Sequence, residues 1–303
     1  MSTKEATVGF GDSRPSDAFS RELGATLRQI RKGSEVGFRD LLKVLGWSPG
    51  KLSKLERGTR GTSDKDIFLL LGHLGADAEQ CDRVREILAT PDRGGFVRGH
   101  EPAGAAPGLL LHERTAQVVT VYETCTVPTT TQTREYAFAL TGSEQSATLR
   151  FERAEQARTR ATSPLRQRWV YYLHELTLRT VVGGPAVMRD QLLNLALLAN
   201  THNTVVRVVP LTAAVDGDLQ RPGMFMAMGP RAKPVVCVEG DTATAFHDDP
   251  VTLDAFQAKM RKLDKVALTV DHSRMVLARW ADWHDRKVHQ DAVDEDVITF
   301  AEA

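Results

Sequence analysis

Apolar residues recur at helical spacing through the first ninety residues of the chain. Leu23, Leu27 and Ile30 are separated by four and three positions, which places them on one face of a helix. Four further short helices are predicted from the apolar sets Leu41, Leu42 and Leu45; Leu52 and Leu55; Ile67, Leu70, Leu71 and Leu74; and Val84, Ile87 and Leu88. Five short helices with brief connections predict a compact all-α domain over residues 19–90.

The third of these helices has well-defined ends. Ser48 is a favourable N-cap, Pro49 occupies the first helical position and Gly58 follows the last turn, so a helix is expected over residues 48–57. Gly50 stands in its first turn, where a glycine lowers helix propensity by up to about 1 kcal/mol. This glycine is unusual in a helix with such clear boundaries.

The second part of the chain, residues 108–303, has a mixed pattern. Helices are expected over residues 109–124, 144–161, 183–200, 250–267 and 271–289, and strands over 169–176, 204–211, 223–229 and 234–240. This succession predicts an α+β domain built around one sheet. The fold class of the whole chain is therefore expected to be α+β, with an all-α helix-turn-helix domain first.

Two segments lack a stable apolar period. Residues 1–18 are polar and contain Gly and Pro, so they are expected to form a flexible tail. Residues 91–107 are rich in Gly, Pro and Ala and are expected to link the two domains. No run of 18 apolar residues and no signal-peptide core is present, so we expect a cytoplasmic protein, associated with the nucleoid and not with a membrane.

Charge is distributed unevenly although the net charge is zero. Residues 21–60 carry ten basic and four acidic side chains, a net charge of +6, and the remaining residues therefore carry −6. A basic first module followed by a mildly acidic remainder is typical of a nucleic-acid-binding protein with a separate second domain.

The basic module contains two short helices separated by a Gly-containing turn, which is the arrangement that places the second helix in the DNA major groove. A solvated surface helix is the alternative interpretation. The helix spacing, the capping signals and the local charge favour the DNA interface. The predicted contact residues are Ser48, Pro49, Gly50, Lys51, Ser53 and Lys54 at the bases or nearby phosphates, and Arg39, Lys43, Arg57 and Arg60 at the DNA backbone.

The segment VGFRDLLKVLGWSPGKLSKLERG resembles the helix-turn-helix of XRE-type (lambda-repressor-like) regulators. Residues 41–48 match the family pattern L-A-x-x-L-G-x-S, and Glu56-Arg57-Gly58 matches its E-x-G exit. Phe38 and Gly50 depart from this pattern. Many members have a polar, phosphate-contacting residue at the position of Phe38, and a side chain that contacts a base at the position of Gly50. The resemblance implies sequence-specific binding of double-stranded DNA.

The second domain resembles the C-terminal domain of unknown function found in actinomycete WhiJ-like regulators. The similar segments are VYYLHELTLRTVVGGPAVMRDQLLNLALLANTHNTVVRVVPL, FMAMGPRAKPVVCVEG, and Gln132-Thr133 followed by Tyr136-Ala137. This resemblance implies a transcriptional regulator that is often encoded beside a small partner protein and that acts in development or antibiotic production.

Few residues of the second domain suggest chemistry. His174-Glu175, Glu239 and residues 247–249 are the candidate acid/base groups, and the last of these is better explained as a helix N-cap. Glu175 and Glu239 each end a predicted strand, where they could share a pocket or pair with an Arg such as Arg179 or Arg189. Candidate ligand or partner residues are therefore Glu175, Arg189 and Glu239.

No cofactor motif, nucleophile motif or metal-ligand spacing is present, so we expect no catalytic residues, no metal and no cofactor. The three cysteines, Cys81, Cys125 and Cys237, are expected to be reduced thiols.

Together these patterns predict a transcriptional regulator, expected to be a homodimer with recognition helices roughly 34 Å apart on a palindromic operator. Its second domain would dimerise, bind a partner protein or sense a ligand. Two alternatives remain open, an antitoxin-like or scaffolding interaction protein and an enzyme domain targeted by the helical module.

Overall fold

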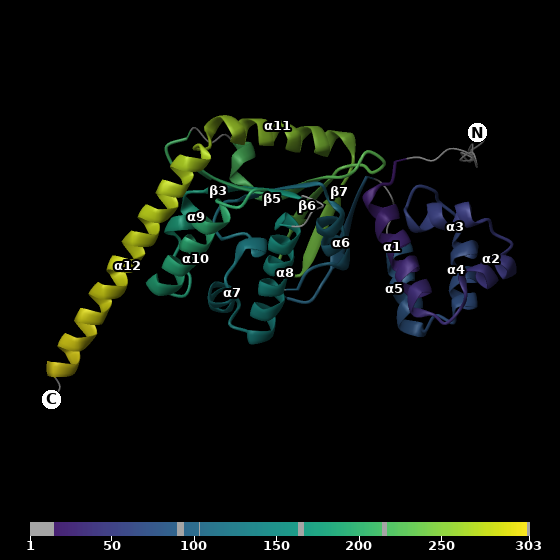
Figure 1. The fold of residues 1–303 in the computed structure, drawn as a ribbon, viewed down its shortest axis with the longest axis horizontal. Helices are drawn as coiled ribbons and strands as arrows, with labels where there is room; N and C mark the ends of the chain where they lie inside the picture. The colour runs from purple at the N-terminus through teal and green to yellow at the C-terminus, as the bar shows by residue number, and fades with distance from the viewer. Residues whose placement is uncertain (1–14, 90–93, 103, 163–166, 214–216, 302–303) are drawn as a thin grey trace, which may run out of the picture. The chain divides into compact units, whose positions relative to one another are not determined.

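The computed structural model describes residues 15–89, 94–102, 104–162, 167–213 and 217–301 of the chain. They form two compact units, one made of Met1–Phe96 with Gly229–Lys233 and the other of Val97–Met228 with Pro234–Ala303. We call them the N-terminal unit and the C-terminal unit (Figure 1). Most of the predicted tail, residues 1–14, lies outside the described residues.

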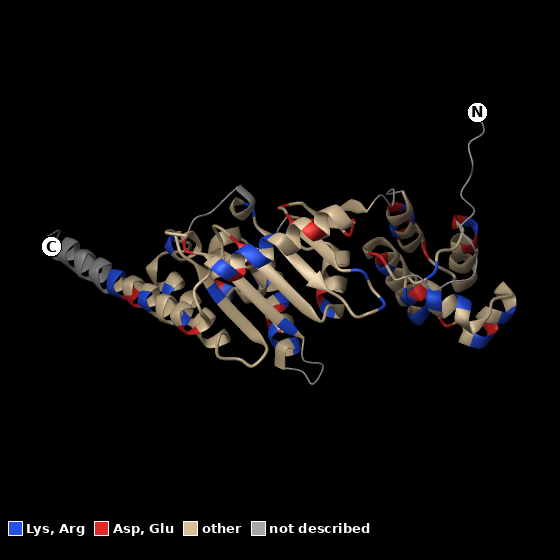
Figure 2. Ribbon diagram, turned by 90° about the horizontal axis from the view of Figure 1, so that it is seen from above, with Lys and Arg blue, Asp and Glu red and all other residues tan. Residues whose placement is uncertain are grey.

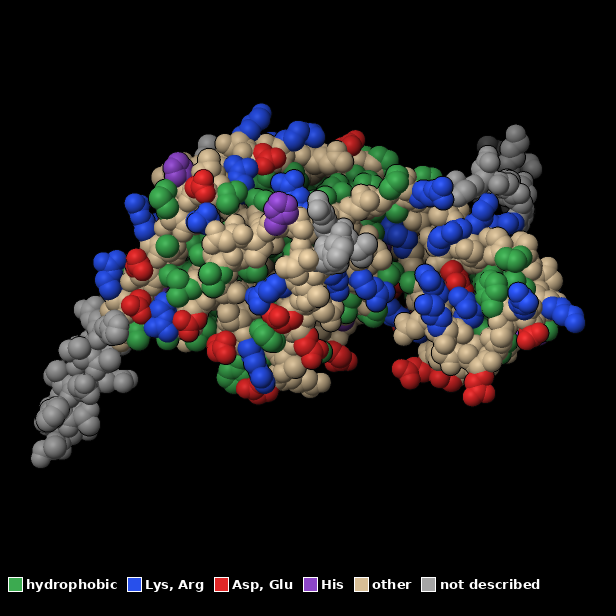
Figure 3. Space-filling model, in the orientation of Figure 1, with side chains coloured by type: hydrophobic (Ala, Val, Ile, Leu, Met, Phe, Trp, Pro, Cys, Tyr) green, Lys and Arg blue, Asp and Glu red, His purple; other side chains and the backbone are tan. Residues whose placement is uncertain are grey.

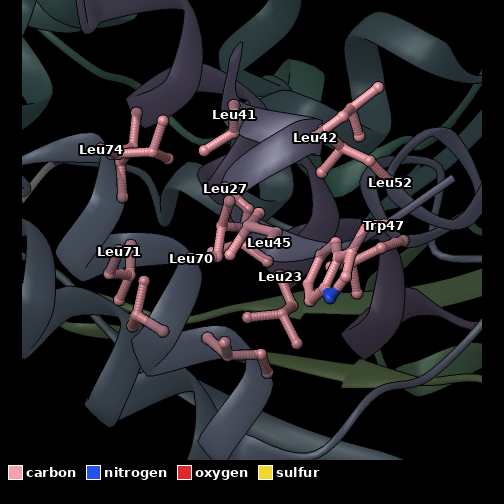
Figure 4. Close-up of a cluster of buried hydrophobic side chains, with 14 of the residues drawn as sticks. Leu23, Leu27, Leu41, Leu42, Leu45, Trp47, Leu52, Leu70, Leu71 and Leu74 are labelled. Atoms are coloured by element: carbon pink, nitrogen blue, oxygen red, sulfur yellow. The ribbon is translucent and has the colours of Figure 1, made fainter. Parts of the chain in front are cut away.

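Five helices build the N-terminal unit, as predicted: α1 (Ala18–Gly33), α2 (Phe38–Leu45), α3 (Pro49–Glu56), α4 (Asp64–Leu74) and α5 (Ala78–Leu88). Their apolar stripes meet in one core, part of which is shown in Figure 4. Leu27, Leu52 and Ile87, from three different helices, are completely buried there. The 3.6-residue period therefore identified the core-facing side of each helix correctly.

Most ends of these helices follow from local chemistry. The Asp17 side chain accepts a hydrogen bond from Ser20 N at 2.7 Å, and Ser63 accepts one from Asp66 N at 3.2 Å. Asp77 and Gln80 form a reciprocal capping box at the start of α5. Because these caps use residues three positions apart, they are visible in the sequence.

Helices α1 and α3 approach each other backbone to backbone through two glycines. A Cβ atom added to Gly24 would lie 2.5 Å from the Leu55 carbonyl oxygen. Gly58, just after α3, has a φ of +70°, and a Cβ atom there would lie 2.6 Å from the Ser20 carbonyl carbon. Any side chain at either position would separate the two helices.

The C-terminal unit is built around a mixed sheet of seven strands in the order β1-β7-β6-β5-β2-β3-β4. The strands are β1 (Gly95–Gly99), β2 (Val118–Glu123), β3 (Arg168–His174), β4 (Thr204–Val209), β5 (Gly223–Ala227), β6 (Val235–Glu239) and β7 (Ala243–His247). Strands β2, β3 and β4 are parallel, whereas β2 and β5, β5 and β6, and β6 and β7 are antiparallel (Figure 2). The predicted α+β domain around one sheet is confirmed.

Helices cover both faces of this sheet, with α11 on one side and α8 on the other in Figure 1. They are α6 (Pro107–Thr115), α7 (Arg134–Thr141), α8 (Glu144–Thr162), α9 (Leu176–Arg179), α10 (Pro185–Leu198), α11 (Pro250–Val266) and α12 (Val270–Ala301). None of the helices in the described part of the chain combines the length and apolarity that crossing a bilayer requires.

Several predicted elements of this unit were wrong or missed. The helix expected over residues 109–124 ends at Thr115, and residues 118–123 form β2, whose run VVTVYE is rich in strand-forming residues. Strand β1 lies within the segment expected to be a linker, and no pattern predicted β7, α7 or α9. Whether such short segments form a strand or a helix depends on their tertiary contacts, because their intrinsic secondary-structure propensity is weak.

A buried ionic cluster joins α6, α8 and β6. The Arg153 guanidinium donates to both Glu113 oxygens, with Nη2 2.6 Å from Oε1, and to both Glu239 oxygens, with Nη1 2.6 Å from Oε1. Burial lowers the pKa of Arg153, but the two carboxylates raise it well above its ordinary value. The guanidinium is therefore charged and its hydrogen bonds hold three elements together.

The glycine contact predicts opposite effects for two helical glycines. Gly24→Ala should destabilise the chain by about 1–3 kcal/mol, because the added Cβ collides with the α3 backbone. Gly72→Ala in α4 is the matched control, since a Cβ atom there meets nothing within 4 Å and should stabilise by about 0.5–1 kcal/mol. Urea unfolding followed by circular dichroism measures both changes, and equal effects of the two substitutions would exclude a tight α1–α3 contact.

Candidate nucleic-acid interface

The turn between α2 and α3 is fixed by four consecutive residues. Gly46 adopts a left-handed φ of +65° and ends α2, and Trp47 N donates to the Leu42 carbonyl at 3.0 Å. Ser48 then caps α3 by accepting a hydrogen bond from Lys51 N at 3.1 Å, with Pro49 in the first turn. The sequence Gly-Trp-Ser-Pro therefore sets where α3 begins relative to α2.

Leu52 and Leu55 anchor α3, and both are buried in the core of the unit. Ser48, Pro49 and Gly50 are exposed on the opposite side. A Cβ atom on Gly50 would meet only the Ser48 hydroxyl, at 3.9 Å, so the first turn of α3 is sterically open. This is the end of the helix that approaches base edges in helix-turn-helix complexes.

The other predicted contact residues surround this open turn. Arg39, Lys43 and Arg57 are exposed, whereas Ser53, Lys54 and Arg60 are half-buried. In Figure 3, Lys and Arg side chains lie over the visible face of the N-terminal unit, and acidic side chains gather along its lower edge. The net positive charge of the segment is therefore displayed on a surface.

Lys51 is placed differently from expectation. Its ammonium lies 2.9 Å from Asp66 Oδ2 and 3.9 Å above the centre of the Trp47 ring, and its side chain is only 23% exposed. Thr62 Oγ1 also donates to Asp66 Oδ2, at 2.8 Å. Lys51 therefore does not point freely outward, because it is held against α4 by an ion pair and by an aromatic face.

This pair shifts the titration of Asp66. The hydrogen bond from Lys51, followed by that from Thr62, lowers the pKa of Asp66. Asp66 was not predicted as part of the site, because it reads in the sequence as a first-turn residue that favours the α4 dipole. A basic residue on α3 facing an acid of the next helix is a tertiary contact that no local period reveals.

A second ion pair fixes the far end of α3. The Arg31 guanidinium of α1 donates through Nε and Nη2 to the two Glu56 oxygens, at 2.5 and 3.0 Å. The hydrogen bond to Glu56 raises the pKa of Arg31, and the same guanidinium lies 5.3 Å from the centre of the Phe38 ring. Glu56, part of the predicted E-x-G exit, thus ties α3 to α1 and to the start of α2.

The three candidate residues of the C-terminal unit are not brought together. Glu175 pairs with Arg179 at 2.7 Å, as one of the alternatives predicted, and also accepts a hydrogen bond from Leu211 N. Arg189 pairs with Asp190 and Asp285, and Glu239 pairs with Arg153. Glu175 follows β3 and Glu239 ends β6, and strands β2 and β5 lie between them in the sheet.

Burial would raise the pKa of both Glu175 and Glu239, but hydrogen bonds and nearby cations lower it, so both groups are charged. Asp249 caps α11 by accepting from Thr252 N at 2.9 Å, as predicted from its position before Pro250. Among the described residues, no group of His, Cys, Asp and Glu is arranged to hold a metal ion. The three cysteines, all among the described residues, form no disulfide, and Cys125 is exposed.

Comparison with known proteins assigns both units. A family model described as a helix-turn-helix domain matches residues 22–84, which contain α2 and α3. A second model, described as a domain of unknown function (DUF5753), matches residues 107–279, more than half of the 303 residues. The chain belongs to the DUF5753 family.

Other comparisons add little to this assignment. No curated protein matches the chain. Nine chains of solved structures match, among them TrmBL2, described as an archaeal chromatin protein that shows a novel mode of DNA binding. That match has 11% sequence identity and a TM-score of 0.32, and it covers 80% of this chain and 81% of the other. At this TM-score the likeness carries no argument about the DUF5753 protein.

The cap at the start of α3 predicts a stability effect that is separate from DNA. Ser48→Ala should destabilise the chain by about 1 kcal/mol, because Lys51 N loses its side-chain acceptor. Ser48→Asp keeps an acceptor at the N-cap and should retain the stability of the parent. Thermal unfolding of the full chain measures both, and a Ser48→Asp variant as unstable as Ser48→Ala would contradict the capping role.

Proposed function

We propose that this DUF5753 protein is a sequence-specific transcriptional regulator of the XRE type that inserts α3 into the major groove of double-stranded DNA. The observation that carries the proposal is the exposed first turn of α3, whose opposite side is anchored by two buried leucines. The matching helix-turn-helix model supports it. The expected location is the nucleoid of the cytoplasm, and the WhiJ-like resemblance suggests an actinomycete source.

Small residues at this turn favour close approach to the base edges. Ser48 and Gly50 add little bulk, and Pro49 removes a backbone donor that would otherwise be unsatisfied. Ser53 and Lys54 follow one turn later and reach bases or nearby phosphates. Backbone phosphates are assigned to the flanking cations Arg39, Lys43, Arg57 and Arg60.

Lys51 takes part through an exchange of partners. In the free protein its ammonium is neutralised by Asp66. On binding, a DNA phosphate or a guanine acceptor would replace Asp66 as the partner of Lys51. The Asp66 carboxylate would then face the anionic duplex, and the repulsion between them would weaken binding. Because the exchange breaks the Lys51–Asp66 ion pair, DNA that offers Lys51 no well-placed acceptor binds more weakly than DNA that offers one. The exchange therefore favours binding of specific sequences.

The C-terminal unit is assigned to dimerisation, to binding of a small partner protein encoded nearby, or to ligand sensing, with no catalytic role. A homodimer would place two α3 helices roughly 34 Å apart, one turn of duplex. Glu175, Arg189 and Glu239 are retained as the partner or ligand residues of this unit. An antitoxin-like or scaffolding protein, and an enzyme domain targeted by the helical unit, are the alternatives.

Replacing both Lys51 and Lys54 with Ala should weaken binding to genomic DNA fragments. The slope of log affinity against log salt should flatten by up to about two units, because two cations no longer displace counterions. Arg85→Ala is the control, since Arg85 is an exposed α5 cation already paired with Asp82. Fluorescence anisotropy over a salt series measures the slopes.

A double variant that bound like the parent would exclude α3 as the recognition helix. A parent chain with no salt-dependent DNA binding would instead favour the antitoxin-like or scaffolding alternative.

Asp66→Asn should have the opposite effect on non-specific binding. On random-sequence duplex, where Lys51 stays paired with Asp66 in the parent, Lys51 then loses its charged partner and becomes available to phosphate, so the salt slope on that duplex should steepen by about one unit. Affinity for a random-sequence duplex should rise, while discrimination between specific and random duplexes falls. Asp64→Asn, on the same turn of α4 but with no ion pair among the described residues, is the matched control.

Equal effects of Asp66→Asn and Asp64→Asn would show that removing any acid near α3 is sufficient, and would contradict the partner exchange of Lys51.

A further inference from the structure

A fully buried histidine lies where α12 packs against α9 (Figure 1). His284 follows Ser273, Leu277 and Ala281 at spacings of four, four and three, on the buried stripe of α12. Its accessible surface is zero, as is that of Leu277. Because the other members of the stripe are small or apolar, a buried imidazole among them requires its own hydrogen-bond partner.

Only one of the two ring nitrogens of His284 has such a partner. Nε2 lies 3.3 Å from the Leu178 carbonyl oxygen of α9. Because a carbonyl oxygen can only accept, Nε2 carries the proton of the neutral ring and Nδ1 carries the lone pair. Nδ1 is buried and has no hydrogen-bond partner among the described residues. The neutral imidazole therefore uses its single N–H to join α12 to α9.

Two tryptophans and two cations surround the imidazole. The Trp283 ring lies edge-on to it, with ring centres 4.9 Å apart, and the Trp280 ring centre lies at 6.3 Å. The Arg179 guanidinium lies 5.1 Å from the centre of the Trp280 ring, and the Lys287 ammonium lies 5.7 Å from that of Trp283. Apolar ring surface and nearby cations both disfavour a positive charge on His284.

Acidic side chains on the elements around α12 are already engaged with cations. The ion pairs are Glu175–Arg179 at α9, Asp190–Arg189 and Asp285–Arg189 at α10, and Asp264–Arg207 at β4. Within α12, Asp282 lies two positions before His284 and therefore on another face, whereas Lys287 lies three positions after it. A proton on the imidazole would therefore face cations and acids that are already paired.

This environment makes the contact sensitive to acid. Burial lowers the pKa of His284, and the hydrogen bond to the Leu178 carbonyl opposes the fall without reversing it. In the unfolded chain a histidine has a pKa of about 6.5, so the unfolded state takes up the proton more readily than the folded state. The stability that the neutral ring supplies is complete above about pH 6.5 and is lost as the pH falls towards the folded pKa.

We propose that His284 is an acid-sensitive latch that holds α12 against α9 only while its ring is neutral. A solvent proton taken up at Nδ1 creates a buried N–H without an acceptor and a charge near two cations, so α12 separates locally from α9 and water reaches the ring. The separation exposes more of the Trp280 and Trp283 rings. The latch lies wholly within the C-terminal unit and does not depend on the proposed binding of DNA.

Hydrogen exchange of the full chain without DNA, between about pH 7.5 and about pH 5 and corrected for the intrinsic effect of pH, tests the latch. The opening equilibrium of α9 and of the His284 region of α12 should rise by up to about tenfold per pH unit below about pH 6.5. Amides of α1, in the N-terminal unit, are the reference and should not share this rise. Constant protection of α9 and α12 over the whole range would overturn the proposal, and this outcome needs no variant.

Substitution separates His284 from the other histidines. His284→Gln keeps an amide that can donate to the Leu178 carbonyl but does not titrate, so it should abolish the rise in opening at low pH. His272→Gln, at an exposed position of the same helix, should behave like the parent. Circular dichroism confirms that each variant is folded.

His174 is a second buried histidine near this contact, and its Nδ1 accepts a hydrogen bond from Leu176 N at 3.3 Å. Burial lowers the pKa of His174, and the charge of Glu175 acts against this fall. His174 is intact in the His284→Gln variant, so any part of the pH dependence that it causes remains there. A His284→Gln chain that opened at low pH like the parent would therefore overturn the latch.

Discussion

The backbone contact between α1 and α3 is the constraint on which the helix-turn-helix depends. Gly24 and Gly58 leave no room for a side chain between the two segments, so α3 has one possible depth against α1. The Arg31–Glu56 pair then fixes the rotation of the α3 exit. Because its C-terminal end is held in this way, α3 keeps its position although the residues of its N-terminal turn are small and exposed.

The first turn of α3 carries small side chains, so contacts with DNA depend on which of the surrounding cations are available. Lys51 is partly neutralised by Asp66 and lies against the Trp47 ring. The positive charge near α3 that has no ion pair among the described residues therefore comes from Lys54 and from exposed cations such as Arg57. A helix with little side-chain chemistry depends on placement and on backbone contacts more than on a dense set of base-reading groups. This agrees with a glycine where relatives of the XRE type often carry a base-contacting side chain.

Local signals allowed the N-terminal unit to be predicted closely, and their absence explains the failures elsewhere. Ser48 and Gly58 mark α3 through interactions within a few residues. The partner of Lys51 is 15 residues away, and the partners of Arg153 are 40 and 86 residues away, so no spacing rule indicates them. The sequence predicts a helix where β2 forms, because the apolar run of β2 continues that of α6, and only the pairing of β2 with β3 and β5 makes it a strand.

The C-terminal unit compensates the buried charge of one guanidinium completely. In the C-terminal unit, Arg153 is desolvated but fully compensated, which makes it a structural centre that joins α6, α8 and β6. One turn away on α8, the Arg150 Nε is buried and has no hydrogen-bond partner within the described part of the chain. Arg153 can join its three elements only while both carboxylates are present, because a buried guanidinium that lost one of them would lose hydrogen bonds that water cannot replace there.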